Sequence, residues 1–289
     1  QLARQDAHPM DLLQAGAVLI GAEDRRDERS REVLLDQAIS VWAKLPTLVA
    51  AYRRFRHDEQ PVEPDPELPF AENFLQMCFD EGPSEEAAAA LDTSLILYAE
   101  HGFNASTFTA RVVASTESDL YSAVSSAVGA LKGALHGGAN EKVMEMLAEF
   151  DSEEEARDWV HEALAEKKKI MGFGHRVYKK GDSRVPIMRE KARELAAASG
   201  NEELMTIAEA VEEIMIEEKG IHPNLDYPAG PLYHMLGLDI PLYTPIFAMT
   251  RVVGWTAHVM EQLADNRIIR PLSNYTGPDV REVVPLEDR

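Results

Sequence analysis

The sequence contains a single cysteine, Cys78, among 289 residues. A lone cysteine excludes an internal disulfide and a metal cluster built on cysteines, and it is typical of a reducing compartment, so we expect a cytoplasmic protein. No run of about 18 uninterrupted apolar residues occurs, and the first residues, QLARQDAHP, lack the basic and apolar parts of a signal peptide. We therefore expect neither a membrane span nor a secretory signal.

Basic residues are also few, since 29 Lys and Arg stand against 50 Asp and Glu and give a formal charge of −21. Such an acidic chain repels nucleic-acid phosphates and anionic membrane surfaces, so we expect no nucleic acid and no membrane as a partner. Apolar residues, by contrast, make up 45% of the chain. That is enough for one large domain or two smaller ones with a packed core, and it excludes disorder as a description of the whole.

Alternating strand patterns are nearly absent, whereas apolar residues recur at spacings of three and four residues, as they do in helices. The sequence therefore predicts an all-α protein. The segment 120–135 is rich in Ala, Ser and Gly, so we expect it to lie buried between helices or at a subunit interface, with an Ala-rich surface helix as the alternative. The predicted helices cover residues 10–21, 33–52, 87–98, 120–135, 143–150, 156–169, 187–198, 204–216 and 246–263.

Residues with known roles at helix ends support several of these boundaries. Ser152 followed by Glu155 is a possible capping box before a helix. Gly200 and Gly220 follow predicted helices and are expected to end them. The acidic stretch 58–69 contains four prolines, which predicts an exposed loop between two core helices.

Positive charge is concentrated in residues 167–193, where ten basic and two acidic residues give +8 and leave −29 for the rest of the chain. Such a segment suits a small anion with phosphates or carboxylates, although a solvated helix face paired with acids is the alternative. Gly172 and Gly174 in this segment permit tight turns and a close approach to a ligand. His175 follows them, and we expect it to be catalytic or ligand-binding rather than a core residue.

Other side chains outside this segment are candidates for chemistry. His136 in LKGALHGGANEKV precedes a predicted helix, whose positive end keeps an imidazole neutral and able to donate to an oxyanion. Asp226 in HPNLDYPAGP lies in a predicted turn crowded by prolines, where desolvation suits it as a general base, an Asx turn or helix cap being the alternative. Arg251 interrupts an apolar helix and needs an anion, which is either Glu261 or another acid of the chain, or a substrate carboxylate. Arg270 lies in NRIIRPLSNYTG, further along.

Two other site types are excluded by missing residues. HGG resembles an esterase oxyanion loop, but the chain has no G-x-S-x-G nucleophile elbow, which disfavours an α/β hydrolase. His161 begins HEALA and lacks the second histidine of an H-E-x-x-H zinc site. We therefore expect no metal site.

Taken together, six motifs resemble the citrate synthase family, most closely the subgroup that includes the 2-methylcitrate synthases. They are YAEHGFNASTFTARV, LKGALHGGANEKV, GFGHRVYKKGDSRVP, HPNLDYPAGP, TPIFAMTRVVGWTAHVMEQ and DNRIIRPLSNYTGP. The resemblance runs from about His8 to the C-terminus, and it departs at Ala134, where relatives commonly have proline.

The resemblance implies the all-α citrate synthase fold, with a large and a small helical domain. It implies that residues 1–136 are the first part of the large domain, 137–237 the small domain and 238–289 the C-terminal part of the large domain. The N-terminal part of the large domain is missing by this comparison. The chain, which begins with Gln, is therefore expected to be a fragment.

By this resemblance, acetyl-CoA or propionyl-CoA condenses with oxaloacetate and water to give citrate or 2-methylcitrate plus CoA. Asp226 is then the base, His136 the stabiliser of the enol and His175 the acid. The physical need is clear, because a carbon acid beside a thioester is too weak for a carboxylate unless the developing oxyanion is stabilised. A catalytically silent helical relative that binds CoA or carboxylates, or an inactive fragment, is the alternative.

The resemblance also assigns the binding residues. Oxaloacetate is expected to contact His101, Arg184, Arg251 and Arg270, the last reaching the site of a partner subunit in a homodimer. CoA, as the acyl-CoA co-substrate, is expected to contact Ile170, Met171, Gly172, Phe173 and Gly174, with Lys167, Lys168 or Lys179 facing its phosphates. No permanently bound cofactor and no metal are implied.

Overall fold

The computed structural model describes residues 7–24, 26, 28–133, 135–175, 178 and 180–289. Ala134 and Lys179, named above, lie outside these residues. Within them there is no β-strand, only an isolated antiparallel bridge between Phe173 and Pro223, so the predicted all-α class is confirmed. The α-helices are α1 (Pro9–Glu23), α2 (Arg31–Arg56), α3 (Phe70–Phe79), α4 (Glu85–Tyr98), α5 (Ala105–Ser115), α6 (Leu120–Leu131), α7 (Ala139–Leu147), α8 (Glu153–Ala165), α9 (Val185–Ser199), α10 (Glu202–Lys219), α11 (Asp226–Met235) and α12 (Tyr243–Ala264). Short 3-10 turns occur at η2 (Ile240–Leu242) and η3 (Leu286–Asp288).

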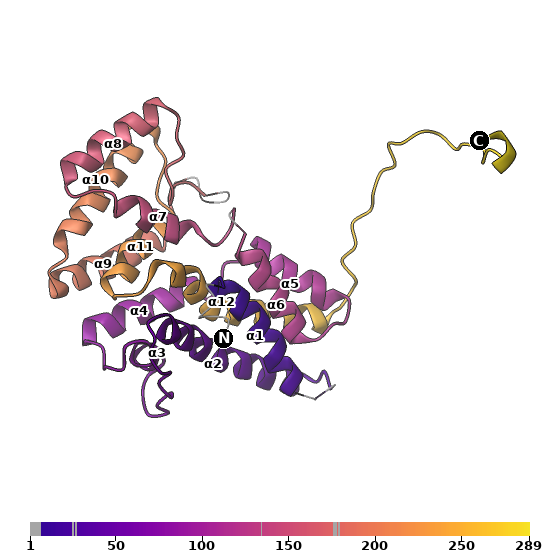
Figure 1. Cartoon of the computed structure of the whole chain (residues 1–289), viewed down its shortest axis with the longest axis horizontal. Helices are drawn as coiled ribbons and strands as arrows, with labels where there is room; N and C mark the ends of the chain where they lie inside the picture. Colours follow the sequence, from indigo (N-terminus) through magenta and orange to yellow (C-terminus); the bar gives the residue numbers. More distant parts are fainter. Residues whose placement is uncertain (1–6, 25, 27, 134, 176–177, 179) are drawn as a thin grey trace.

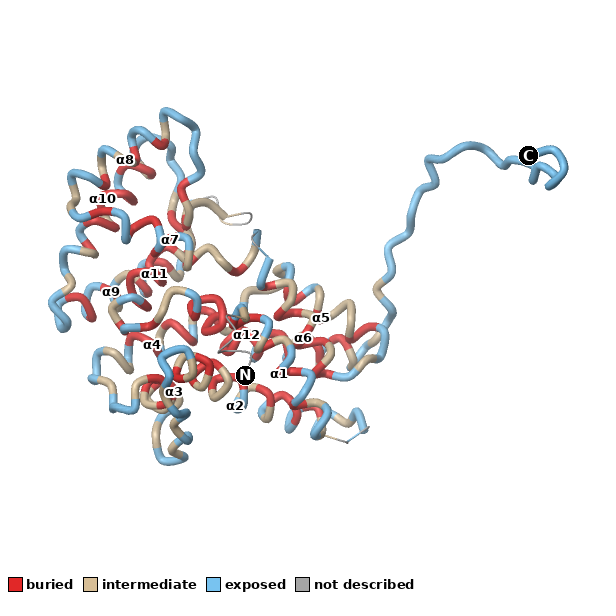
Figure 2. Tube along the Cα trace, viewed as in Figure 1, coloured by how far each residue is buried: buried red, intermediate tan, exposed pale blue. Residues whose placement is uncertain are grey.

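One group of helices is built around α12, which packs against α1, α2, α4, α5 and α6 (Figure 1). Figure 2 shows that buried residues concentrate along this central helix. Its fully buried side chains include Tyr243 and Trp255. The small-residue helix α6 packs against α1, α5 and α12, which confirms that it is buried between helices.

The helices α7 to α11 form a second group beside the first (Figure 1). There α11 packs against α7 and α9, while α10 packs against α8. Contacts of α4 with α9 and of α12 with α7 join the two groups. The chain passes from the first group to the second after α6 and returns before α12, close to the expected domain boundaries, which stay predictions.

Several helix ends follow the predicted chemistry. The Ser152 hydroxyl accepts a hydrogen bond from the Glu155 N–H at 3.2 Å, and the Glu155 carboxylate accepts from the Asp151 N–H at 2.9 Å, so α8 begins with a capping interaction. Gly200 and Gly220 end α9 and α10 with φ of 71° and 62°. Both glycines adopt the left-handed conformation that favours a residue without a Cβ.

Three helices were not predicted, namely α3, α5 and α11. The prediction of a turn at Asp226 is wrong, because Asp226 is the first residue of α11. Pro228 lies in the first turn, where a backbone N–H has no intrahelical partner in any case, so it is compatible with the helix. Pro231 lies further inside. The predicted helices 120–135 and 156–169 end early, at Leu131 and Ala165.

On length and composition, α2 is the one described helix that could cross a membrane. This is weak evidence, because buried core helices meet the same criterion. Its buried side chains, among them Val41, Leu45 and Val49, belong to the core cluster. Packing against α1, α3 and α12 accounts for its apolar residues.

After α12 the chain is extended, and Figure 1 shows it running away from the helical body. Ile269 is still tied to α5, since its N–H donates to the Ser115 hydroxyl at 2.9 Å. Beyond it, residues 270–289 are exposed (Figure 2).

Replacing the cap of α8 should destabilise the protein. We expect Ser152→Ala to lower the free energy of unfolding by about 1 kcal/mol, because the Glu155 N–H loses its acceptor. Urea unfolding followed by circular dichroism measures this change. The control Ser273→Ala, in the exposed tail, should change stability by less than about 0.5 kcal/mol. Equal effects of the two substitutions would contradict the capping role.

Candidate active site

Two histidines from different helix groups meet at the centre of the site. His101 follows α4, and His175 lies between α8 and α9; their Nε2 atoms are 3.2 Å apart. The Tyr178 N–H donates to Nδ1 of His175 at 3.2 Å, so the proton of a neutral His175 is on Nε2 and points at His101. Burial and the charges of Arg184 and Arg251 lower the pKa of His101 to about 4, so it is neutral and able to accept.

The Asp226 carboxylate is held by a tyrosine. The Tyr98 hydroxyl, at the end of α4, donates to Oδ1 of Asp226 at 2.7 Å. Burial raises the pKa of Asp226 to about 6, against the opposing hydrogen bond of Tyr98 and the charges of Arg184 and Arg251. A carboxylate with this pKa is mostly ionised at pH 7 and is a stronger base than an exposed aspartate.

His136 lies before α7 and contacts the first turn of α5. Its Nε2 is 3.3 Å from the backbone N of Ser106 and 2.9 Å from the Ser106 Oγ. A backbone N–H can only donate, so this contact favours Nε2 as an acceptor and the ring proton on Nδ1. Burial, with a smaller effect from Arg251, lowers the pKa of His136 to about 4. The ring is therefore a neutral donor at pH 7.

Arg251 is only 2% exposed, although it carries a charge. Its Nε donates to the Tyr98 carbonyl at 2.6 Å, and burial lowers its pKa to about 10. Among the described residues it forms no ion pair, and Glu261, one of the anions considered above, is paired with Arg111 instead. The guanidinium thus lacks a carboxylate partner within the described part of the chain.

Arg184 lies at the start of α9, as its N-cap residue. It pairs with the buried Asp182, Nη2 to Oδ2, at 2.6 Å, and its Nη1 donates to the Leu97 carbonyl at 3.2 Å. The contact with Leu97 crosses from the second helix group to α4 of the first. Arg184 therefore contributes positive charge next to His101.

Six of the seven residues expected to act in catalysis or to bind oxaloacetate are linked by hydrogen bonds or by effects on one another's pKa. They are His101, His136, His175, Arg184, Asp226 and Arg251. The seventh, Arg270, is exposed in the extended segment after α12. Within a single chain the described structure does not bring it to the other six.

The five residues expected to contact CoA form a tight loop. Gly172 and Gly174 have φ of +83° and +78°, and the Asn224 N–H donates to the Gly172 carbonyl at 2.9 Å. A Cβ on Gly172 would lie 2.6 Å from a methyl carbon of Val143 and 2.7 Å from the Tyr227 ring, so only glycine fits there.

A cavity of about 320 Å³ lies beside this loop. It has an apolar floor and a rim of lysines, a combination that suits a ligand with a flat apolar part and anionic groups. Its lining residues are Leu164, Lys167, Lys168, Lys169, Ile170, Phe173, Met215, Lys219 and Ile221.

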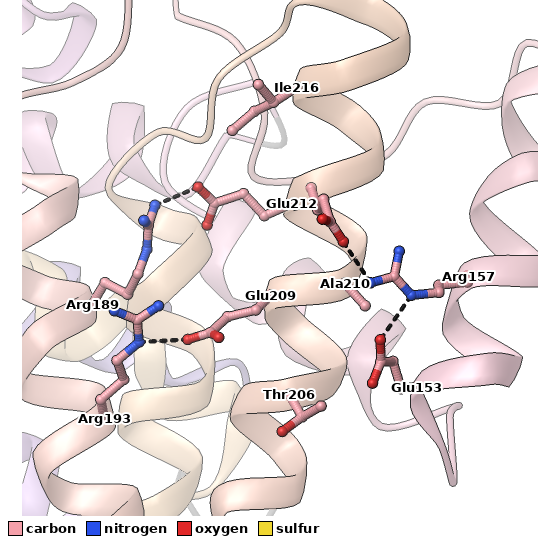
Figure 3. A pocket seen from close by; sticks show the side chains of 10 residues that line it. Glu153, Arg157, Arg189, Arg193, Thr206, Glu209, Ala210, Glu212 and Ile216 are labelled. Atoms are coloured by element: carbon pink, nitrogen blue, oxygen red, sulfur yellow. Dashed lines mark hydrogen bonds and ion pairs between the residues drawn. The ribbon is translucent and has the colours of Figure 1, made fainter.

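The far end of the basic segment is paired with acids. Figure 3 shows Arg189 and Arg193 on α9 facing Glu212 and Glu209 on α10, around an open pocket of about 370 Å³. Arg157 on α8 completes it with its own glutamate partners. The alternative interpretation, a paired helix face, therefore holds for the α9 side of residues 167–193. Anion binding by the part before Arg184 stays a prediction.

Groups of three or more His, Cys, Asp or Glu side chains that could hold a metal ion do not occur among the described residues. The expectation of no metal site stays a prediction.

Comparisons with known proteins agree with the residue pattern. Residues 1–272 match the family model described as citrate synthase, C-terminal domain. The chain belongs to the citrate synthase family. It is 48% identical over 280 residues to the citrate synthase of Mycolicibacterium smegmatis, an alignment covering 96% of this chain and 75% of that protein. It is 49% identical over 276 residues to the 2-methylcitrate synthase of Mycobacterium tuberculosis, covering 96% of this chain and 70% of that protein.

A solved structure of the same family also matches the fold. The citrate synthase of Thermoplasma acidophilum, in a ternary complex with carboxymethyl coenzyme A and oxaloacetate, superposes with a TM-score of 0.88. The two chains are 33% identical, and the match covers 98% of this chain and 76% of the other.

The sequence did not predict two residues that contact the expected catalytic side chains Asp226 and His136 in this member of the citrate synthase family. Tyr98 and Ser106 both lie in the motif YAEHGFNASTFTARV, on either side of His101. Nothing in their spacing links Tyr98 to Asp226 or Ser106 to His136, because those partners are 128 and 30 residues away. Only the tertiary packing that brings α4 to α11, and α5 to the segment before α7, creates these contacts.

Removing the Tyr98 hydroxyl should make Asp226 harder to ionise. The O–H stabilises the carboxylate, so we expect Tyr98→Phe to raise the pKa of Asp226 above its value of about 6, by about 0.5 to 1 pH unit for one net hydrogen bond. Carboxyl ¹³C NMR measures the titration directly. Tyr121→Phe removes a similar hydrogen bond, to Asp24, and is the control that should leave Asp226 unchanged. A fall in the Asp226 pKa would refute the interpretation.

Proposed function

We propose that this chain condenses acetyl-CoA or propionyl-CoA with oxaloacetate and water, giving citrate or 2-methylcitrate and CoA. The observation that carries the proposal is the pair formed by a buried carboxylate with a pKa of about 6, Asp226, and a neutral imidazole with its proton on Nδ1, His136. Relatives named citrate synthase and 2-methylcitrate synthase support both acyl donors. The bound molecules of the Thermoplasma complex support the substrate classes.

In the first step, Asp226 takes a proton from the carbon next to the thioester. Negative charge then develops on the thioester oxygen, and the Nδ1–H of His136 donates a hydrogen bond to it. A preorganised neutral donor stabilises such an oxyanion without first losing a proton to bulk water. The Tyr98 hydroxyl holds Oδ1 of Asp226, which leaves Oδ2 as the oxygen that accepts the proton.

In the second step, the enolate carbon forms a bond to the ketone carbon of oxaloacetate. The Nε2–H of His175 protonates the ketone oxygen as it becomes an alcohol. His101, Arg184 and Arg251 bind the two carboxylates, which supply the anion that Arg251 lacks. Water then hydrolyses the thioester and releases CoA.

Movement between the two helix groups accompanies these steps in our proposal. We assign residues 137–237 to a small domain that closes over a large one built from 1–136 and 238–289. Asp226 and His175 belong to the former and His101 and Arg251 to the latter, so closure brings the reacting groups together and excludes water.

A homodimer completes the site in this proposal. Its basis is the exposed position of Arg270 in the segment after α12, and Figure 1 shows that this segment runs away from the helical body. In the dimer Arg270 of one chain contacts the oxaloacetate bound to the other. We further propose a cytoplasmic setting, with acyl-CoA as co-substrate and without a metal or a permanently bound cofactor.

Turnover tests the reaction. We expect the chain to release CoA when oxaloacetate is supplied with either acyl-CoA, and Asp226→Asn to lower kcat by about 10² to 10⁴-fold, because the base is lost. Thiol release measured with a chromogenic disulfide reports the rate. Asp92→Asn, an exposed change on α4, is the control and should retain activity. A folded chain that releases no CoA from either donor would favour the silent relative instead.

The ratio of kcat/KM for propionyl-CoA to that for acetyl-CoA, measured in the same assay, assigns the acyl donor. One methylene in a pocket is worth about 1 to 3 kcal/mol, so a ratio far from one identifies the preferred donor.

The lysine-rimmed cavity should bind the phosphates of CoA. We expect the double variant Lys167→Ala with Lys169→Ala to raise KM for acyl-CoA about 5 to 20-fold and to leave KM for oxaloacetate unchanged, because only CoA carries phosphates. Steady-state kinetics at constant ionic strength measure both constants. Lys44→Ala with Lys132→Ala, two lysines that do not line the cavity, is the charge-matched control. A rise in KM for oxaloacetate alone would contradict the assignment.

A further inference from the structure

A tryptophan of α12 forms a hydrogen bond with Ser106, the residue that contacts His136. Trp255 is fully buried, and its indole Nε1–H donates to the Ser106 Oγ at 3.0 Å. Ser106 lies in the first turn of α5 and is also fully buried. The three side chains Trp255, Ser106 and His136 therefore form a continuous chain of hydrogen-bonding contacts from the core to the ring.

The Ser106 hydroxyl has one proton but two neighbouring atoms that could accept it. Its Oγ lies 2.8 Å from Oδ1 of Asn104 and 2.9 Å from Nε2 of His136. An indole N–H can only donate, so Trp255 occupies one lone pair of Oγ. The single hydroxyl proton must then go to Asn104 or to His136. Oδ1 of Asn104 already accepts the Thr107 N–H, as the cap of α5.

Two arrangements of this chain differ in the state of His136. When the hydroxyl donates to His136, Nε2 is an acceptor and the ring proton is on Nδ1. When the hydroxyl donates to Asn104, the second lone pair of Ser106 Oγ faces Nε2 of His136. Oγ can then accept a hydrogen bond from a proton on Nε2. The second arrangement places the ring proton on the nitrogen that faces away from the thioester in the proposed reaction.

We propose that Trp255 is a positioning residue, whose indole N–H acts through the Ser106 hydroxyl to hold His136 with its proton on Nδ1. This inference rests on the proposed role of His136. Hydrogen bonds in a chain polarise one another, so a hydroxyl that accepts from Trp255 is a better donor and a poorer acceptor. The Ser106 backbone N–H favours the same ring state from a longer distance, 3.3 Å.

The first test observes the ring rather than the reaction. In the 289-residue chain labelled with ¹⁵N-histidine, we expect His136 to show an unprotonated Nε2, assigned by its loss in His136→Gln. Trp255→Phe keeps an aromatic ring but removes the donor, and it should lower the ratio of Nδ1–H to Nε2–H forms about five to tenfold, the range of one net hydrogen bond. An unchanged ratio in folded Trp255→Phe overturns the proposal.

A matched control is available, because Trp159→Phe makes the same change on α8, where Trp159 packs against Phe150. It should leave the His136 resonances unmoved, and an equal shift in this control would overturn the proposal. If Trp255→Phe does not fold, Ser106→Ala replaces it, since it breaks the chain at the hydroxyl and retains the indole. It should lower the same ratio, and no change there also overturns the proposal.

A double-substitution cycle tests the route through Ser106. We expect Trp255→Phe to lower kcat about five to tenfold with KM for oxaloacetate unchanged, and to have no further effect in the Ser106→Ala background. Additive losses in kcat would show that Trp255 acts by another route. Full activity of His136→Gln would instead refute the proposed function, so the two failures are distinguishable.

Discussion

The buried charge of Arg251 is the constraint on which the rest of the site depends. A guanidinium inside an apolar helix is costly unless an anion meets it, and in the described chain Arg251 contacts the Tyr98 carbonyl and the face of the Phe247 ring but no carboxylate. The same charge lowers the pKa of His101 and His136 and opposes the rise in the pKa of Asp226. Burial is the larger cause of the low pKa of both imidazoles, and the charge of Arg251 acts in the same direction, while it also favours the ionised form of Asp226.

Close packing of α12 against the segment after α4 makes this arrangement possible. A Cβ on Gly254 would lie 2.6 Å from the Ala99 carbonyl, so glycine allows the two backbones to approach. The Gly254 N–H donates to that carbonyl at 3.1 Å, which fixes the segment that leads to His101. Arg251 and Trp255 lie three positions before and one after this contact. The helix α12 thus carries both the charge of Arg251 and the indole of Trp255, and its contact at Gly254 fixes the segment that leads to His101.

Although the chain has an overall charge of −21, residues 167–193 are positively charged, and the basic residues at the two ends of this segment have different surroundings. The arginines of α9 are neutralised by glutamates of α10 and stabilise the packing of that helix group, as Figure 3 shows. Arg184 and the lysines near Gly172 line the candidate site instead. An acidic protein can therefore present a local positive field to acidic substrates, while the distant negative charge is screened by salt over about 10 Å.

The sequence by itself determined the helical class, most helix positions, the caps at Ser152 and Gly200, and the family, because periodicity, capping and motifs are local properties of the chain. It wrongly predicted a turn at Asp226, because prolines usually interrupt helices. In the structure Asp226 begins α11, and Pro228 lies in its first turn, where proline is tolerated. Only the tertiary structure decided that Glu261 pairs with Arg111 and not with Arg251, which hydroxyl holds Asp226 and which ring nitrogen of His136 faces Ser106. Those answers depend on contacts between residues 30 to more than 100 positions apart, which local pattern cannot encode.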